Sequence, residues 1–157
     1  MKSTMRFRLK IAFVFHLLAS LLIIFFGLMY ILRSQFMPYH AIAVGKNWAE
    51  VDPTFQILIL ALMRVAGGGF LAGAFAIIII LLKPLKQDFQ WAYWAIPIIG
   101  MPVSLSSLYA TIYVAKNTPA STPWMAAALG GLFIMVGFIL SVIPDAKAKT
   151  DEMIEKV

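Results

Sequence analysis

Arg64 is the residue of this chain whose setting most clearly suggests chemistry. It stands in the apolar run LMRVAGGGFLAG, residues 62–73. A guanidinium in such a run either extends to the membrane surface as an anchor or faces a polar cavity. In the second case it can bind an anionic or carbonyl-bearing ligand, or form an internal ion pair. The sequence leaves both interpretations open.

A partner for Arg64 is expected, because an unpaired guanidinium in a medium of low dielectric is costly. The groups predicted at its depth carry a hydroxyl or a carboxylate, and they are Tyr30, Glu50, Asp52, Tyr109 and Tyr113. We therefore predict that any ligand site faces outward and is formed by Arg64 and these five residues.

Small residues in two apolar blocks predict close helix packing. Gly69 and Gly73 form a GxxxG pair, and Gly130 and Gly131 give the last block a similar character. Glycines at this spacing let two helix backbones approach closely within a membrane. Three adjacent glycines, residues 67–69, could instead break the helix, as in transporters.

Hydroxyl groups gather in the third apolar block. A helix there places Pro102, Ser106, Tyr109 and Tyr113 on one face. Proline removes a backbone hydrogen bond, and serines or water can satisfy the freed carbonyls. The block is therefore either a kinked helix whose hydroxyls bond to its own backbone, which the sequence favours, or the polar wall of a ligand cavity.

The histidines and the missing residue types limit the chemistry. His16 and His40 belong near opposite membrane surfaces, so one chain cannot supply a haem pair, and we expect His16 to hydrogen-bond a neighbour. The chain has no cysteine, and its apolar blocks hold no Asp or Glu. Metal-ligand clusters and nucleophile motifs are also missing from the sequence. We therefore predict no catalytic residue, no metal and no cofactor.

Four long apolar blocks must position these residues. The chain is 62% hydrophobic and only 13% charged, about half the charged fraction of a soluble domain. Each block reaches the ~20 residues with which a helix crosses the hydrocarbon layer. The blocks are residues 11–32, 54–82, 91–115 and 122–143. The sequence predicts an all-α integral membrane four-helix bundle, one domain over residues 1–157.

Basic residues predict the orientation of this bundle. The two ends of the chain and the loop after the second helix carry nine Lys and Arg, whereas the opposite side carries only Arg33, Lys46 and Lys116. Basic loops stay in the cytoplasm, so we expect both termini there and the chain in the inner cell membrane. The net charge of +6 is thus a topology signal, and no nucleic-acid partner is expected.

One longer loop, residues 33–53, joins the first two helices on the outer side. Its mixture of aromatic, acidic and apolar residues is too apolar for a flexible linker. The sequence Asp52-Pro53-Thr54 is typical of a helix start. We expect a partly ordered loop that folds over the outer end of the bundle.

Three segments carry a resemblance to known proteins: MPYHAIAVGKNWAEV, LMRVAGGGFLA and YATIYV…TPW. Together they resemble a set of uncharacterised small bacterial membrane proteins with four predicted helices, over roughly residues 35–125. The arginine followed by glycines in the second helix is also similar to the DoxX-like four-helix group. That similarity implies an accessory subunit of a quinone-linked redox complex.

Two classes of function follow. The first is a non-catalytic membrane protein, either an accessory subunit or a binder of a lipid or quinone-like apolar molecule near Arg64. Abundant packing motifs and missing catalytic motifs favour it. The second is a small oligomeric transporter or channel, for which the inner half offers few polar residues besides His16 and Ser20. The expected partners are the lipid bilayer and either another membrane subunit or a second copy of the chain.

Overall fold

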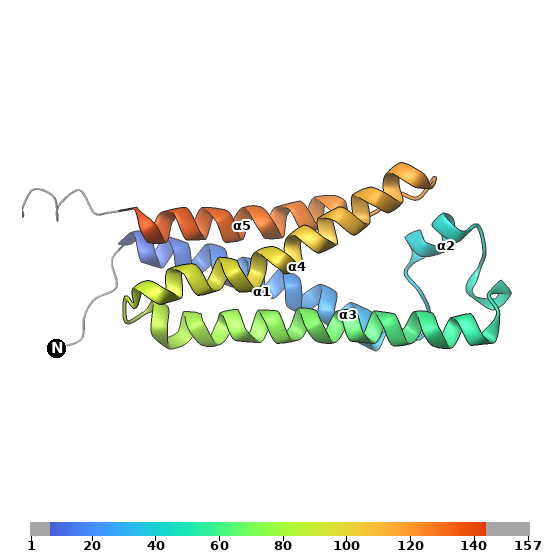
Figure 1. Cartoon of the computed structure of the whole chain (residues 1–157), viewed down its shortest axis with the longest axis horizontal. Helices are drawn as coiled ribbons and strands as arrows, with labels where there is room; N and C mark the ends of the chain where they lie inside the picture. The colour runs from blue at the N-terminus through green and yellow to red at the C-terminus, as the bar shows by residue number, and fades with distance from the viewer. Residues whose placement is uncertain (1–6, 144–157) are drawn as a thin grey trace, which may run out of the picture.

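The structure is a computed structural model that describes residues 7–143, and its regular elements in that range are all helical (Figure 1). Four helices are long and apolar enough to cross a membrane. They are α1 Phe7–Leu32, α3 Pro53–Ile80, α4 Gln90–Asn117 and α5 Trp124–Val142. The predicted all-α architecture with four long apolar helices is confirmed, and each boundary lies within about one helical turn of the predicted one.

The four long helices form a ring in which each packs against two neighbours. Helix α1 contacts α3 and α5, and α4 contacts the same two helices from the opposite side. Successive helices run in opposite directions (Figure 1), so residues 7 and 143 lie at the same end of the bundle. There the guanidinium of Arg8 donates a hydrogen bond to the carbonyl oxygen of Ile143. The predicted cytoplasmic termini, residues 1–6 and 144–157, lie outside the described residues.

The end of the bundle that carries residues 7 and 143, which we call the closed end, has a continuous apolar core. Its buried members include Leu9, Ile77, Leu81, Leu85 and Ile96. Here α3 passes into a single wide turn, η2 Leu81–Leu85, which contains Pro84. Proline lacks the N–H that a regular α-helix would use, and a wide turn accommodates that missing bond.

The opposite end, which we call the cavity end, is covered by the segment between α1 and α3. This segment forms a short helix, α2 Pro38–Val44, and a single turn, η1 Trp48–Glu50 (Figure 1). Pro38 begins α2 and Gly45 ends it with a φ of 69°, a left-handed conformation that glycine adopts without strain.

Apolar contacts and hydrogen bonds attach this segment to the bundle. Phe36 and Met37 are buried together with Met63 of α3. The side-chain amide of Gln56 donates to the carbonyl oxygens of Trp48 and Val51, at 2.8 and 3.0 Å. The loop that the sequence predicted to be partly ordered therefore packs on the helices beneath it.

Helices α3 and α4 diverge toward the cavity end (Figure 1). They touch near Gly73, where an added Cβ would lie 3.4 Å from Cγ2 of Val103. Directly before this contact α4 contains Pro102, and beyond it the hydroxyls of Ser106 and Ser107 donate to carbonyl oxygens one turn back, both at 2.7 Å. Prolines and such serine contacts bend helices. The divergence opens the space that the candidate site occupies.

Candidate functional site

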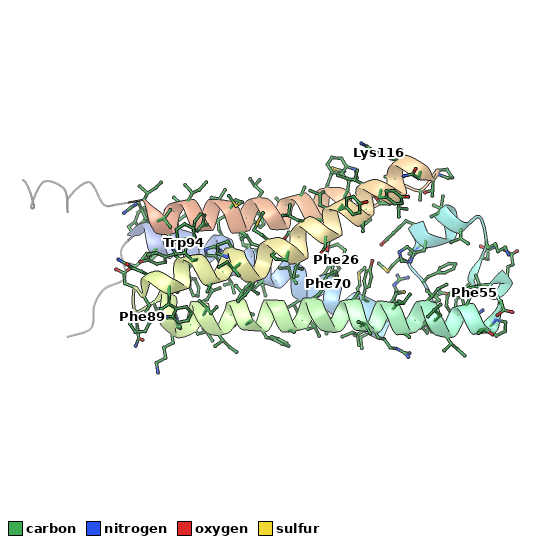
Figure 2. All side chains as sticks on the ribbon, viewed as in Figure 1. Phe26, Phe55, Phe70, Phe89, Trp94 and Lys116 are labelled. Carbon is green, nitrogen blue, oxygen red and sulfur yellow. The ribbon has the colours of Figure 1, made fainter. Side chains whose placement is uncertain are left out.

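A cavity of about 360 Å³ lies between the four long helices at the cavity end. Figure 2 shows Phe26 of α1 and Phe70 of α3 in the space between α3 and α4. The apolar part of the wall comes from all four helices and includes Leu22, Ile23, Phe26, Ala66, Phe70, Val103, Ala110, Val114, Ala126 and Ala127. Its volume and its mainly apolar wall are those of a small-molecule site.

Three polar side chains line the cavity where α2 covers it. The hydroxyl oxygens of Tyr30, from α1, and Tyr39, from α2, are 2.8 Å apart and share a hydrogen bond. The ring of His40 stands edge-on to that of Tyr39, with 4.3 Å between the ring centroids. We call Tyr30, Tyr39 and His40 the polar cluster.

The polar cluster consists of neutral hydrogen-bond donors. Burial raises the pKa of Tyr39, and the hydrogen bond to Tyr30 adds to this effect, so the phenol keeps its proton. Burial lowers the pKa of His40, so its ring stays neutral near pH 7. Because Nδ1 of His40 accepts a hydrogen bond from the backbone N–H of Met37 at 3.4 Å, the ring hydrogen belongs on Nε2.

The hydroxyl groups of α4 form a second polar strip along the cavity wall. Ser104, Ser107 and Thr111 are spaced at three and four residues and line the cavity together with Ser106. Ser107 and Thr111 donate to carbonyl oxygens of their own helix, both at 2.7 Å. The two interpretations of this block are therefore compatible, since these hydroxyls bond to the backbone of their own helix and also line a cavity.

The cavity wall carries no formal charge. None of its residues is Asp, Glu, Lys or Arg. Among residues 7–143, no group of three or more His, Cys, Asp or Glu could hold a metal ion. The wall therefore offers apolar surface and neutral hydrogen-bonding groups to a ligand.

The cavity opens between α3 and α4, where the two helices diverge. Ser106 and Ala110 of α4 line the cavity and are nevertheless exposed on the surface of the bundle. Ala66 and Phe70, the α3 residues of the wall, are partly exposed. Both α3 and α4 are long apolar helices. The opening therefore lies on the apolar outer surface of the bundle.

Of the six residues predicted to form a ligand site, only Tyr30 lines the cavity. Arg64 is exposed on α3, and no hydrogen bond or ion pair links it to the part of the chain that the structure describes. The predicted pairing of Arg64 with an acidic residue or a tyrosine of the third helix is therefore wrong. The ligand-binding role of Arg64 stays a prediction.

The two acidic residues of the predicted site stabilise local turns instead. A carboxylate oxygen of Glu50 accepts from the backbone N–H of Asn47 at 2.7 Å. A carboxylate oxygen of Asp52 accepts from the backbone N–H of Thr54 at 2.8 Å and thereby caps α3. Both carboxylates bind N–H groups that a turn or helix start leaves without a partner.

Tyr109 and Tyr113 lie on the outer face of α4. Their rings stack with 6.0 Å between centroids, and neither residue lines the cavity. The prediction from helical spacing that Tyr109 and Tyr113 share a face of α4 is correct. The face of α4 that points into the bundle, however, is the one that carries Ser104, Ser107 and Thr111.

The predicted packing glycines have different surroundings. Gly130 and Gly131 of α5 lie against Ser104 of α4, whereas an added Cβ at Gly69 would meet no atom within 4 Å. The closest approach in the glycine triplet is at Gly67, where a Cβ would lie 2.7 Å from the carbonyl oxygen of Gly27. Helix α3 is continuous through residues 67–69, so the alternative of a broken helix is wrong.

His16 occupies the closed end and not the candidate site. Its side chain is fully buried, and neither ring nitrogen has a hydrogen-bond partner within the described residues. The ring lies against the backbone of α5, where a Cβ at Gly137 would be 2.5 Å from Cε1. The ring contacts the backbone of Gly137, and the expectation that His16 hydrogen-bonds a neighbour stays a prediction.

Sequence reasoning missed Tyr39, His40 and Ser104 as cavity residues. The signal for the first two was present, because Pro38 begins and Gly45 follows a run of seven residues that suits a short capped helix. The inward orientation of Ser104 depends on how α4 is rotated against α5, and the spacing of residues does not fix that rotation.

The comparisons with known proteins return no match. No family model matches the chain, and neither a curated protein nor a solved structure is significantly similar to it. The resemblance to small four-helix membrane proteins and to the DoxX-like group therefore stays a prediction.

Proposed function

We propose that this chain is a non-catalytic, multi-pass membrane protein that binds one apolar, lipid-like or quinone-like molecule in the cavity at the cavity end. The observation that carries the proposal is the cavity of about 360 Å³, with its mainly apolar wall and a few convergent polar groups. The chain would act as a binder by itself or as the accessory subunit of a larger membrane complex.

The direction of the cavity opening supports an apolar ligand. The opening lies between α3 and α4, two helices with long apolar stretches. A molecule dissolved in the bilayer could enter there without crossing the polar segment over the cavity end. Binding would then depend on shape and hydrogen bonds, because moving apolar surface from lipid into the cavity gains no hydrophobic free energy.

The transporter alternative receives less support from the closed end. A transport path needs a continuous polar route across the bundle. At the closed end Leu81, Leu85 and Ile96 are fully buried in the apolar core. This core favours a site that is open at one end of the bundle over a path through it.

The proposal is tested by filling the cavity. We expect native mass spectrometry of the chain in mild detergent to detect one retained apolar molecule. Ala127→Phe should abolish retention, because Ala127 lines the cavity and the added ring would occupy ligand space. Ala72→Phe is the matched control, since Ala72 is exposed on α3 and outside the wall.

A second cavity-filling variant keeps the test valid if Ala127→Phe does not fold. Ala126→Phe places the same ring at the neighbouring wall position, and thermal unfolding in detergent identifies which variants are folded. Equal retention by the wild type and a folded cavity variant would contradict the proposal. So would a wild-type chain that retains no molecule from a total membrane lipid extract.

A further inference from the structure

We infer that the cavity selects an electrically neutral molecule whose polar end is a hydrogen-bond acceptor, such as an ester or ketone oxygen. The polar cluster, Tyr30, Tyr39 and His40, would receive this oxygen, and the apolar wall would hold the rest of the molecule. The inference rests on the proposed function and specifies the class of ligand that the same site takes.

The hydroxyl pair leaves one hydrogen atom for a ligand. Each phenol has one O–H, and the 2.8 Å contact between Tyr30 and Tyr39 uses one of the two. Neither hydroxyl has another hydrogen-bond partner in the described range. Whichever tyrosine donates to the other, the second O–H remains available in the cavity.

His40 supplies a second donor beside this pair. Its Nδ1 accepts from the backbone N–H of Met37, so a neutral ring carries its hydrogen on Nε2. Among the described side chains, only His16 has polar atoms that are both sealed from solvent and without a partner. Nε2 of His40 is therefore accessible, and the lowered pKa of His40 keeps it a neutral donor.

Two neutral donors without a nearby charge suit an uncharged acceptor. No residue of the wall is Lys, Arg, Asp or Glu, so a carboxylate, phosphate or ammonium in the cavity would lack a counter-charge. Burying an unpaired charge costs far more free energy than burying a hydrogen-bonded carbonyl. A hydrocarbon without an acceptor would leave the donors unsatisfied, which is also unfavourable.

The test compares four probes that share a chain and differ at one end: methyl dodecanoate, dodecanoate, dodecylammonium and tridecane. Binding is measured by native mass spectrometry at a pH of about 8, well above the ordinary pKa of a carboxylic acid. Methyl dodecanoate should bind at least about threefold tighter than tridecane, and tighter still than either charged probe.

Variants of the polar cluster test whether it causes the preference for methyl dodecanoate over tridecane. Replacing both Tyr30 and Tyr39 with Phe keeps the rings and removes the shared hydroxyls, whereas either single variant would leave one free O–H. The double variant, and His40→Phe separately, should each weaken methyl dodecanoate about threefold to tenfold and leave tridecane unchanged. The control replaces Tyr109 and Tyr113 with Phe, because that pair is exposed and outside the wall.

An infrared measurement reports the hydrogen bond directly. The stretching frequency of an isotope-labelled ester carbonyl should be lower in the wild type than in the double tyrosine variant, because a hydrogen bond weakens the C=O bond. Tightest binding by dodecanoate or dodecylammonium, or equal binding of methyl dodecanoate and tridecane, would overturn the inference and leave the proposed function standing. If none of the four probes bound the wild type, the proposed function would fail as well.

Discussion

The closed end and the cavity end are built from the same four helices but differ in how side-chain size matches helix separation. At the closed end, bulky residues fill the interior, and Ile77, Leu81 and Ile96 are fully buried. At the cavity end the wall combines small residues, among them Ala126 and Ala127, with larger ones such as Phe26 and Phe70. There α3 and α4 also diverge (Figure 1), so the side chains do not fill the wider gap and leave a cavity.

Glycine permits close helix contact at the closed end but has a mixed role at the cavity end. At the closed end it permits close contact, since a Cβ at Gly100 would lie 2.5 Å from Cδ1 of Ile134 and one at Gly137 equally close to His16. At the cavity end, Gly130 and Gly131 make contacts of ordinary length, whereas a Cβ at Gly67 would lie 2.7 Å from the carbonyl oxygen of Gly27. Inside a membrane, apolar composition does not distinguish a packed interior from a binding site; fit between side chains and helix spacing does.

The largest expected effect compares Gly137→Ala with Gly131→Ala, the same change at two interior positions of α5, of which Gly131 is nearer the cavity end. A methyl group at Gly137 would lie 2.5–2.7 Å from three atoms of the His16 ring, which is fully buried. We expect this overpacking to lower the free energy of unfolding by about 1–3 kcal/mol.

Gly131→Ala provides the control for that prediction. Its methyl group would meet Cβ of Ser104 at 3.5 Å, an ordinary contact, and alanine favours the helix by up to about 1 kcal/mol. We expect a neutral or slightly stabilising effect. Thermal unfolding of both variants in the same detergent provides the measurement. Equal losses of stability would mean that the two ends do not differ in packing.

The sequence was sufficient to predict the helices but not their rotation. Apolar length alone identifies α1, α3, α4 and α5, because crossing the hydrocarbon layer requires about 20 apolar residues. The rotation of each helix follows from contacts between helices. Gly67 rather than Gly69 therefore meets α1, although both belong to the same triplet.

The position of the candidate site was predicted only in part. The sequence predicted a site at the α2 end of the bundle and included Tyr30, which lines the cavity. It centred the site on Arg64 because a charge in an apolar run is conspicuous. The wall instead consists of neutral groups, and no pattern of charge could have pointed to Tyr39, His40 or Ser104.

A smaller effect concerns pH and is confined to the cavity end. Burial lowers the pKa of His40, so the ring takes up a proton more readily when α2 leaves the bundle. The docked state of α2 should therefore be most stable above the ordinary histidine pKa of about 6.5 and should weaken as the pH falls below it. The ring of His40 packs against that of Tyr39, whose pKa is raised by burial, so Tyr39 keeps its proton over this pH range.

Amide hydrogen exchange, corrected for its intrinsic pH dependence, measures this effect. Protection of α2 should decrease between about pH 7 and pH 5.5, by less than about 1.4 kcal/mol per pH unit. His40→Phe should remove the dependence, because phenylalanine does not titrate. Protection of the α3 core around Ile77 should not follow the same curve. A parallel loss at both ends would show that His40 does not act locally.

The smallest expected effect is that of Arg64→Lys. Arg64 is exposed and has no hydrogen bond or ion pair to the described residues, and the cavity wall does not include it. Lysine carries the same charge on a similarly long apolar stem and extends to a membrane surface as arginine does. The variant should therefore change the free energy of unfolding by less than about 0.5 kcal/mol and leave ligand retention unaltered. Thermal unfolding and native mass spectrometry of the retained molecule measure the two quantities. Lysine cannot reproduce the planar, two-pronged contact of a guanidinium. A folded Arg64→Lys chain that lost its ligand would therefore place Arg64 in the binding site and show that the site is not electrically neutral.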